Sequence, residues 1–198
     1  MDAETLVLNL KGGFRIVVPA DIGAISTYVF LEQEDWFEDE AELVRRLARP
    51  GFRMLDIGAN DGFYSLAAAA ASGGDARIDA FEPTPDVAAM LRASVAINGF
   101  AGIEVHQMAL GDRTGELVLA HGSDSALNRI VATGEGTRVE MRTLDAVARD
   151  RGFDAIDFVK LDVEGAETAV IEGGRDFFAR QSPLVMFEIV DGATVRLD

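Results

Sequence analysis

Residues 54–70 read MLDIGANDGFYSLAAAA, and this stretch decides the fold. It joins a short apolar run to a turn that contains Gly58 and Gly62, and then to an alanine-rich segment with high helix propensity. Glycines in such a turn permit a tight bend and a close approach of the backbone to a ligand. The N-terminus of the helix that follows offers free N–H groups to a carboxylate or phosphate. The stretch therefore predicts a strand, a ligand-binding turn and a helix.

The same alternation of strand and helix continues along the chain. The predicted core strands are 52–57, 77–81, 103–109, 156–161 and 184–189. The predicted helices between them are 63–71, 85–97, 144–151 and one that starts at 167 and ends near Gly173 and Gly174. Strands that alternate with helices imply an α/β fold with a doubly wound, mostly parallel sheet. The carboxyl ends of all its strands then meet at one edge, where ligands bind.

Two segments depart from this alternation. Residues 5–10 and 14–18 predict a β-hairpin that ends at Pro19, and residues 38–48 have helical spacing. We therefore divide the chain into an N-terminal extension, residues 1–50, packed on a main domain, residues 51–198. The strands expected at 116–120 and 137–142 flank a loop rich in glycine, serine and aspartate, and they predict a β insertion after the third core strand.

Composition excludes several classes of function. The chain of 198 residues has no cysteine, so disulfides, zinc–thiolate sites and thiol nucleophiles are absent. The net charge of −16 repels phosphate backbones and makes nucleic acid a poor partner, whereas a neutral sugar or a neutral or cationic small molecule is easier to attract. The N-terminus lacks the pattern of a secretory signal, and no apolar run is long enough to span a bilayer. These features predict a soluble, cytoplasmic protein without a membrane partner.

The residues that follow the first three core strands predict a nucleoside cofactor. Asp56, at the end of the first strand, suits a cationic amine, and the helix N-terminus beyond the glycine turn suits a carboxylate. S-adenosylmethionine carries both groups. Glu82, after the second strand, is spaced to bind a ribose diol, and Met108, after the third, is expected beside the adenine ring. The predicted cofactor-binding residues are Asp56, Gly58, Ala59, Asn60, Gly62, Glu82, Pro83, Met108, Ala109 and Asp162.

Two other classes of function stay open as alternatives. An NAD-dependent oxidoreductase with a Rossmann fold would normally show G-x-G-x-x-G, but Asn60 occupies the middle glycine position here. A phosphate-binding lysine pattern is also missing. The second alternative is a non-catalytic module that retains only the cofactor pocket.

The ordered motifs resemble those of the FkbM-type methyltransferases. The resemblance runs from about Trp36 to Ile189 and includes LDIGANDG at 55–62, FEP at 81–83, ALGD at 109–112 and TLD at 143–145. Its most specific part is VKLDVEGAE at 159–167, and it closes with FEI at 187–189. It implies a Rossmann-like class I methyltransferase fold, S-adenosyl-L-methionine as the donor, and transfer to a hydroxyl of a sugar or small molecule.

The fourth core strand is expected to supply the catalytic groups. A hydroxyl acceptor must lose a proton during methyl transfer, so a base or a polarising partner is needed. Asp162 is the first choice to face the methionine end of the cofactor or the acceptor hydroxyl, and Glu164 is the next, with Glu167 as an alternative. His121, in the 121–136 loop, is a further candidate base. Lys160 lies in a core strand and is expected to meet a carboxylate, because an unpaired buried charge is costly. The spacing of histidines and acids does not support a metal site.

The sequence does not identify the acceptor, whose pocket we expect residues 1–50 and the 121–136 loop to shape. Only nine residues follow Ile189, which leaves no room for the last two strands of a full class I sheet. A compact version, a sheet completed by a neighbouring chain in a homo-oligomer, and a truncated C-terminus are the three alternatives.

Overall fold

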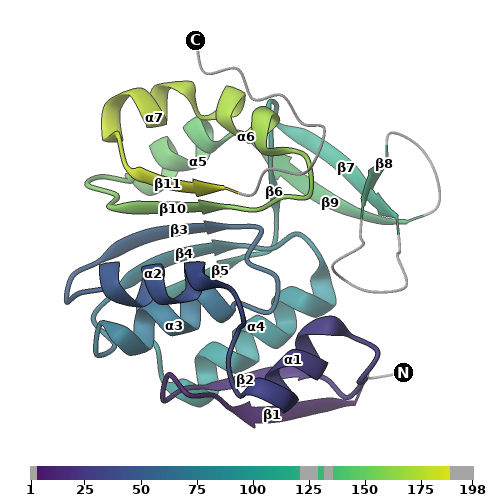
Figure 1. Cartoon of the computed structure of the whole chain (residues 1–198). Coiled ribbons are helices and arrows are strands. Elements are labelled where there is room, and N and C mark those ends of the chain that lie inside the picture. Colours follow the sequence, from purple (N-terminus) through teal and green to yellow (C-terminus); the bar gives the residue numbers. More distant parts are fainter. Residues whose placement is uncertain (1–3, 121–128, 132–135, 188–198) are drawn as a thin grey trace.

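The computed structural model describes residues 4–120, 129–131 and 136–187 (Figure 1). Its centre is a five-stranded parallel sheet in the order β11-β10-β3-β4-β5. The strands are Arg53–Ile57 (β3), Arg77–Phe81 (β4), Ile103–His106 (β5), Phe158–Leu161 (β10) and Leu184–Phe187 (β11). The strand order reverses between β3 and β10, so a crevice is expected at the carboxyl ends of these neighbouring strands. The predicted doubly wound α/β fold is therefore confirmed.

Helices cover both faces of this sheet (Figure 1). The first face carries α2 (Asp39–Leu47), α3 (Phe63–Ala71) and α4 (Pro85–Asn98), and the second carries α5 (Leu144–Arg151), α6 (Glu167–Gly173) and α7 (Arg175–Gln181). Alternate residues of each strand point to opposite faces. Met54 and Phe158 accordingly belong to the first core cluster, and Leu55 and Leu161 to the second. None of the helices in the described ranges combines the length and apolar character that crossing a membrane requires.

The N-terminal segment packs on α4. The expected hairpin is present as β1 (Thr5–Asn9) and β2 (Arg15–Pro19), and the helix α1 (Ile25–Gln33), which the sequence analysis did not predict, follows it. The buried N–H of Val17 donates to Oγ of Ser94 at 2.8 Å, and the N–H of Arg15 donates to Oδ1 of Asn98 at 2.8 Å. Side chains of α4 thus satisfy the backbone of the hairpin's inner strand.

A second, four-stranded sheet has the order β6-β9-β7-β8. Its strands are β6 (Ala109–Leu110), β7 (Gly115–Ala120), β8 (Arg129–Val131) and β9 (Thr137–Arg142). The expected insertion strands are present, but the single strand expected over 103–109 is wrong. It divides into β5 in the first sheet and β6 in the second, because the chain turns at 107–108, where the N–H of Met108 donates back to the carbonyl of His106 at 3.0 Å.

Candidate functional site

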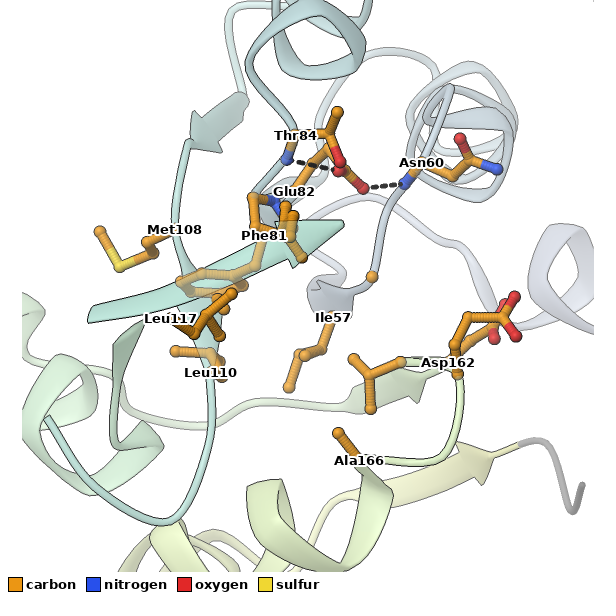
Figure 2. A pocket seen from close by; sticks show the side chains of 16 residues that line it. Ile57, Asn60, Phe81, Glu82, Thr84, Met108, Leu110, Leu117, Asp162 and Ala166 are labelled. Atoms are coloured by element: carbon orange, nitrogen blue, oxygen red, sulfur yellow. Dashed lines mark hydrogen bonds between the residues drawn. The ribbon is translucent and has the colours of Figure 1, made fainter. Parts of the chain in front are cut away.

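A cavity of about 800 Å³, open to solvent, lies along the carboxyl ends of β3, β4 and β10 (Figure 2). Figure 2 shows Met108 and Asp162 on opposite sides of it, with Glu82 and Asn60 between them along one rim. Predicted site residues form much of its lining: Gly58, Asn60, Glu82, Pro83, Met108, Ala109, Asp162 and Glu164. The structure therefore gathers residues from the ends of separate strands at one edge.

Glu82 follows β4, and backbone groups hold its carboxylate in place. The N–H of Asn60 donates to Oε2 at 3.0 Å, and the N–H of Thr84 donates to Oε1 at 2.8 Å. Burial raises the pKa of this carboxyl, and the two backbone donors offset the effect only in part. The hydroxyl of Thr84 also bonds the carboxylate. The two oxygens together have about four lone pairs, so the carboxylate can still accept from a ligand. The geometry fixes this acceptor at the cavity.

Gly58 begins the turn after β3 and comes very close to the backbone of the strand next to it. Its φ is +79°, and a Cβ at this position would lie 1.7 Å from the carbonyl oxygen of Asp162. Its N–H and that of Ala59 both donate to the carbonyl of Phe81, at 3.0 and 2.9 Å. Only glycine fits here, and the resulting turn leaves the backbone open to the cavity.

Ala59 and Gly62 support the turn rather than line the cavity. Ala59 is buried in the core beneath it. Gly62 begins α3 with φ +84°, and a Cβ there would meet Cδ1 of Leu91 on α4 at 2.0 Å. The close contact that requires glycine at 62 is therefore a helix–helix contact.

Asp56 also lies outside the cavity lining, although it was expected to meet the amine of the cofactor. Its side chain is fully buried, Oδ2 accepts from the hydroxyl of Ser65 at 2.6 Å, and Oδ1 has no hydrogen-bond partner among the described residues. Burial raises the pKa of this carboxyl, against the attraction of Lys160. Nζ of Lys160 lies 3.8 Å from Oδ1. In this structure Asp56 is thus the buried counter-charge of a lysine.

Asp162 and Glu164 line the cavity in the loop that follows β10. Asp162 is held from two sides: its N–H donates to the carbonyl of Ile57 at 3.0 Å, and its Oδ2 accepts from Nζ of Lys160 at 3.1 Å. Its side chain remains 36% exposed. Glu164 has a φ of +52°, which places it at a sharp turn of the loop. The expected encounter of Lys160 with a carboxylate is confirmed.

Glu167 shapes this loop. Its buried carboxylate accepts from the N–H groups of Val163 and Gly165 through Oε1, at 3.1 and 3.2 Å. The side chain is therefore committed to the backbone that carries Asp162 and Glu164, and it does not line the cavity.

A second cavity, of about 570 Å³, adjoins Asp162 and Lys160. It is lined by Glu38, Glu40, Tyr64, Lys160, Leu161, Asp162, Met186 and Phe187. Tyr64 donates through its hydroxyl to Oε2 of Glu38 at 2.7 Å, which ties α3 to the segment before α2. Asp162 lines both cavities.

Of the two histidines, His106 ends β5 but does not line the cavity, and His121 lies outside the described residues. Nε2 of His106 lies 2.7 Å from Oδ1 of Asp79, and its ring packs 4.8 Å from that of Phe81. Asp79, Glu104 and His106 could together hold a metal ion, but Arg151 forms ion pairs with both carboxylates. His121, the other candidate base, lies outside the described residues, as do residues 122–128 of its loop.

The apolar wall of the first cavity could not be identified from the sequence. The wall includes Phe81 and Leu110, and Leu117 and Leu119 from the second sheet. Leu117 and Leu119 alternate along β7, a pattern that predicts one buried face but does not say what that face meets. The wall depends on how the insertion folds over the main sheet.

The lining suits the nucleoside expected from the sequence. Small-molecule sites are typically lined mostly by apolar side chains with a few well-placed polar groups, and this cavity has that character. Apolar side chains at one end match a flat base, the carboxylate of Glu82 matches a diol, and Gly58 permits close approach of a polar tail. The residues present therefore fit S-adenosylmethionine.

Comparisons with known proteins agree with this geometry. The family model described as "Methyltransferase FkbM domain" matches residues 56–193. The 31-O-demethyl-FK506 methyltransferase FkbM of Streptomyces tacrolimicus is 31% identical, over 73% of this chain and 68% of the relative. The 2-O-methyltransferase NoeI of Sinorhizobium fredii is 28% identical, over 68% of this chain and 62% of the relative.

A solved structure shares the fold. The crystal structure of a methyltransferase FkbM from Methylobacillus flagellatus aligns with a TM-score of 0.52 at 20% identity. The alignment covers 74% of this chain but 39% of that protein. The chain thus spans about two thirds of the curated relatives and well under half of the crystallised protein.

Proposed function

Because the chain belongs to the FkbM family of methyltransferases, we propose that it transfers a methyl group from S-adenosylmethionine to a hydroxyl oxygen of a small molecule or sugar. The observation that carries the proposal is the cavity at the carboxyl edge, in which Glu82, Gly58 and Asp162 follow three neighbouring strands. These groups match, in order, the ribose, the close-packed sulfonium region and the methionine end of one extended nucleoside.

Glu82 and the apolar wall would hold the nucleoside half. Backbone donors fix both oxygens of Glu82, so the carboxylate can accept a ribose hydroxyl without a change of rotamer. Met108 and Leu117 lie at the other end, where they would pack on the adenine ring. A fixed carboxylate beside an apolar slot binds a nucleoside in one orientation.

Asp162 would act where the donor and the acceptor meet. S-adenosylmethionine supplies a methyl group already activated on a sulfonium, so the protein needs chiefly to align the acceptor oxygen with it. As the acceptor oxygen bonds to the methyl carbon and the carbon–sulfur bond breaks, the hydroxyl proton passes to a base. We assign this role to the carboxylate of Asp162, which lines both cavities, with Glu164 as the alternative. Its position lets an acceptor in the second cavity reach it.

The hydroxyl acceptor rests on two further observations. The curated relatives named above are both described as methyltransferases that act at oxygen positions. The net charge of −16 and the carboxylates Glu38 and Glu40 in the second cavity disfavour an anionic acceptor. A neutral sugar or another neutral small molecule with a hydroxyl, or one that carries an amine, is the class expected.

Binding and turnover test the proposal separately. Isothermal titration calorimetry should detect S-adenosylmethionine and S-adenosylhomocysteine, with NADH as a comparison ligand that does not bind. A metabolite extract incubated with S-adenosyl[methyl-³H]methionine should then yield a labelled neutral or cationic product. Preferential binding of NADH would overturn the assignment. Cofactor binding without methyl transfer to any hydroxyl compound in a broad panel would favour a non-catalytic module.

A further inference from the structure

Lys160 is a buried cation with more partners than charge neutralisation requires. Its side chain is 7% exposed, and its Nζ lies 3.1 Å from Oδ2 of Asp162, 3.2 Å from the carbonyl oxygen of Gly58 and 3.8 Å from Oδ1 of Asp56. β10 pairs with β3 so that Lys160 stands opposite Asp56. The register of two parallel strands therefore sets this cluster.

The surroundings keep Lys160 charged and in place. The ring of Tyr64 covers the ammonium at 5.1 Å from the ring centroid. Burial alone would lower the pKa of Lys160, but the carboxylates of Asp56 and Asp162 outweigh it and raise the pKa. An ammonium enclosed in this way has little freedom to move, so the groups it binds are held with it.

The two shortest contacts of the ammonium go to the cavity wall. Asp162 and Gly58 line the first cavity, whereas Asp56 does not. If Lys160 served only to balance a buried charge, Asp56 would be a sufficient partner. Of the three contacts of Nζ, the one to Asp56 would then not be the longest. The geometry instead joins the turn after β3 to the loop after β10 through a single cation.

We propose that Lys160 is a positioning residue for the methionine end of the cofactor. Its ammonium holds the Asp162 carboxylate and the Gly58 carbonyl at a fixed separation, and Asp56 is its counter-charge. Oδ1 of Asp162 and the second lone pair of the Gly58 carbonyl then accept the cofactor's ammonium. With Asp162 engaged in this way, Glu164, the alternative named above, serves as the base of methyl transfer. This inference rests on the proposed use of S-adenosylmethionine.

Ligands that differ only in the methionine part test the proposal. S-adenosylhomocysteine carries that part, and 5′-methylthioadenosine shares the adenine and ribose but lacks the ammonium and carboxylate. In Lys160→Met, calorimetry should show the Kd for S-adenosylhomocysteine raised 10-fold or more, while the Kd for 5′-methylthioadenosine changes less than 2-fold. Lys11→Met, at the chain's exposed other lysine, should change neither Kd.

Two outcomes would overturn the proposal. If Lys160 has only a structural role, its removal should raise the Kd for both ligands by similar factors. If Lys160 acts only as a nearby positive charge, its removal should leave the Kd for S-adenosylhomocysteine unchanged or lower it. If the wild-type protein binds neither ligand, the proposed function fails instead, so the two failures are distinguishable.

Further variants separate positioning from stability and from direct contact. Because Lys160→Met leaves Asp56 buried without its cation, Asp56→Asn/Lys160→Met should restore the Tm and still bind S-adenosylhomocysteine weakly. Recovery of affinity together with the Tm would mean that Lys160 is structural. In an Asp162→Asn background, Lys160→Met should raise the Kd for S-adenosylhomocysteine by less than a further 3-fold. A full additional loss there would mean that Lys160 does not act through Asp162, which contradicts the proposal.

Discussion

At the scale of single residues, Glu82 combines two functions in one carboxylate. It accepts from the backbone of Asn60 and Thr84 and faces the cavity with the same oxygens. Its role is therefore sensitive to which of its atoms are acceptors, and not only to its charge.

Glu82→Gln should weaken S-adenosylmethionine binding roughly 10- to 100-fold, in line with about 1.5–3 kcal/mol for a hydrogen bond to a charged group. The amide replaces one acceptor by a donor, which must then face a backbone N–H or a ribose hydroxyl. Calorimetry measures the loss, and Glu140→Gln, an exposed glutamate on β9, is the matched control. An affinity equal to that of the wild type would remove Glu82 from the ribose site.

Asp61 makes the stability of the turn depend on pH. Burial raises its pKa from 3.8 to about 6, and the bonds from Phe63 and Ser26 offset this only in part. The folded state therefore binds the proton more tightly than the unfolded chain. Its contribution favours folding at low pH and is lost as the pH rises through about 6.

Asp61→Asn should therefore stabilise the protein relative to the wild type at pH 7 but not at pH 4. Asparagine can still accept from the N–H of Phe63 through Oδ1. The difference in the free energy of unfolding should grow with pH to on the order of 2–3 kcal/mol. Urea unfolding of both proteins at several pH values measures it, and a difference independent of pH would contradict the shifted pKa.

The sequence selected the candidate site residues by the strand that each follows, and several of them do come together at one cavity. Glu82, Gly58 and Asp162 all line the cavity as expected. It could not show that Asp56 faces Ser65 and Lys160 rather than the cavity, because the direction of a side chain depends on its packing. Nor could it separate Gly58, which approaches a strand, from Gly62, which approaches a helix.

At the scale of elements, the turn after β3 and the loop after β10 are packed backbone to backbone. Neither side of this contact has a flexible side chain that could yield, because the atom opposite Gly58 is the carbonyl oxygen of Asp162. The turn after β3 and the loop after β10 can therefore lie this close together only because Gly58 has no Cβ.

Gly58→Ala should be strongly destabilising, by at least about 3 kcal/mol, because positive φ strain and a backbone overlap add together. Gly73→Ala is the matched control. Its φ is +71°, but nothing lies within 4 Å of the added Cβ, so only the strain of about 1–2 kcal/mol applies. Chemical unfolding of both variants measures the difference. Equal losses would mean that the loop after β10 moves away without cost.

Elements in which apolar residues recur at a regular spacing were predicted well, and the others were not. α3, β4 and α5 begin and end at the residues expected from the sequence. The segment of α1, ISTYVFLEQ, has no polar face and several β-branched residues, and it exposes Ile25 and Tyr28 while burying Phe30, so its spacing does not indicate a helix. α7 was missed because Gly173 and Gly174 read as the end of a helix rather than as a junction between two.

At the scale of the whole molecule, the N-terminal hairpin is joined to α4 by side-chain to backbone bonds. Oγ of Ser94 accepts from the buried N–H of Val17 and donates to the carbonyl of Met90 at 3.0 Å. One hydroxyl thus joins elements that are 77 residues apart in the chain. We expect the hairpin and the parallel sheet to unfold together.

Ser94→Ala should cost about 1–3 kcal/mol, because it leaves a buried N–H without an acceptor. Hydrogen exchange should speed up at Val17 and at its neighbours Ile16 and Val18. Ser72→Ala is a suitable control, since Ser72 is also buried but its hydroxyl donates only to the carbonyl of Ala69, so no N–H loses its acceptor. If Val17 remains as protected as in the wild type, the hairpin does not depend on this bond.

The apolar wall of the first cavity comes from both sheets, with Phe81 from the main one and Leu117 and Leu119 from the other. The second sheet buries only a small cluster of its own, formed by Ala109, Leu117, Leu119, Val139 and Met141. A purine in the slot would displace water from between two separately packed layers and bring them into one continuous interior. Bound S-adenosylmethionine would then stabilise the contact between the two sheets in addition to supplying the methyl group. S-adenosylhomocysteine carries the same purine, so it would stabilise this contact equally.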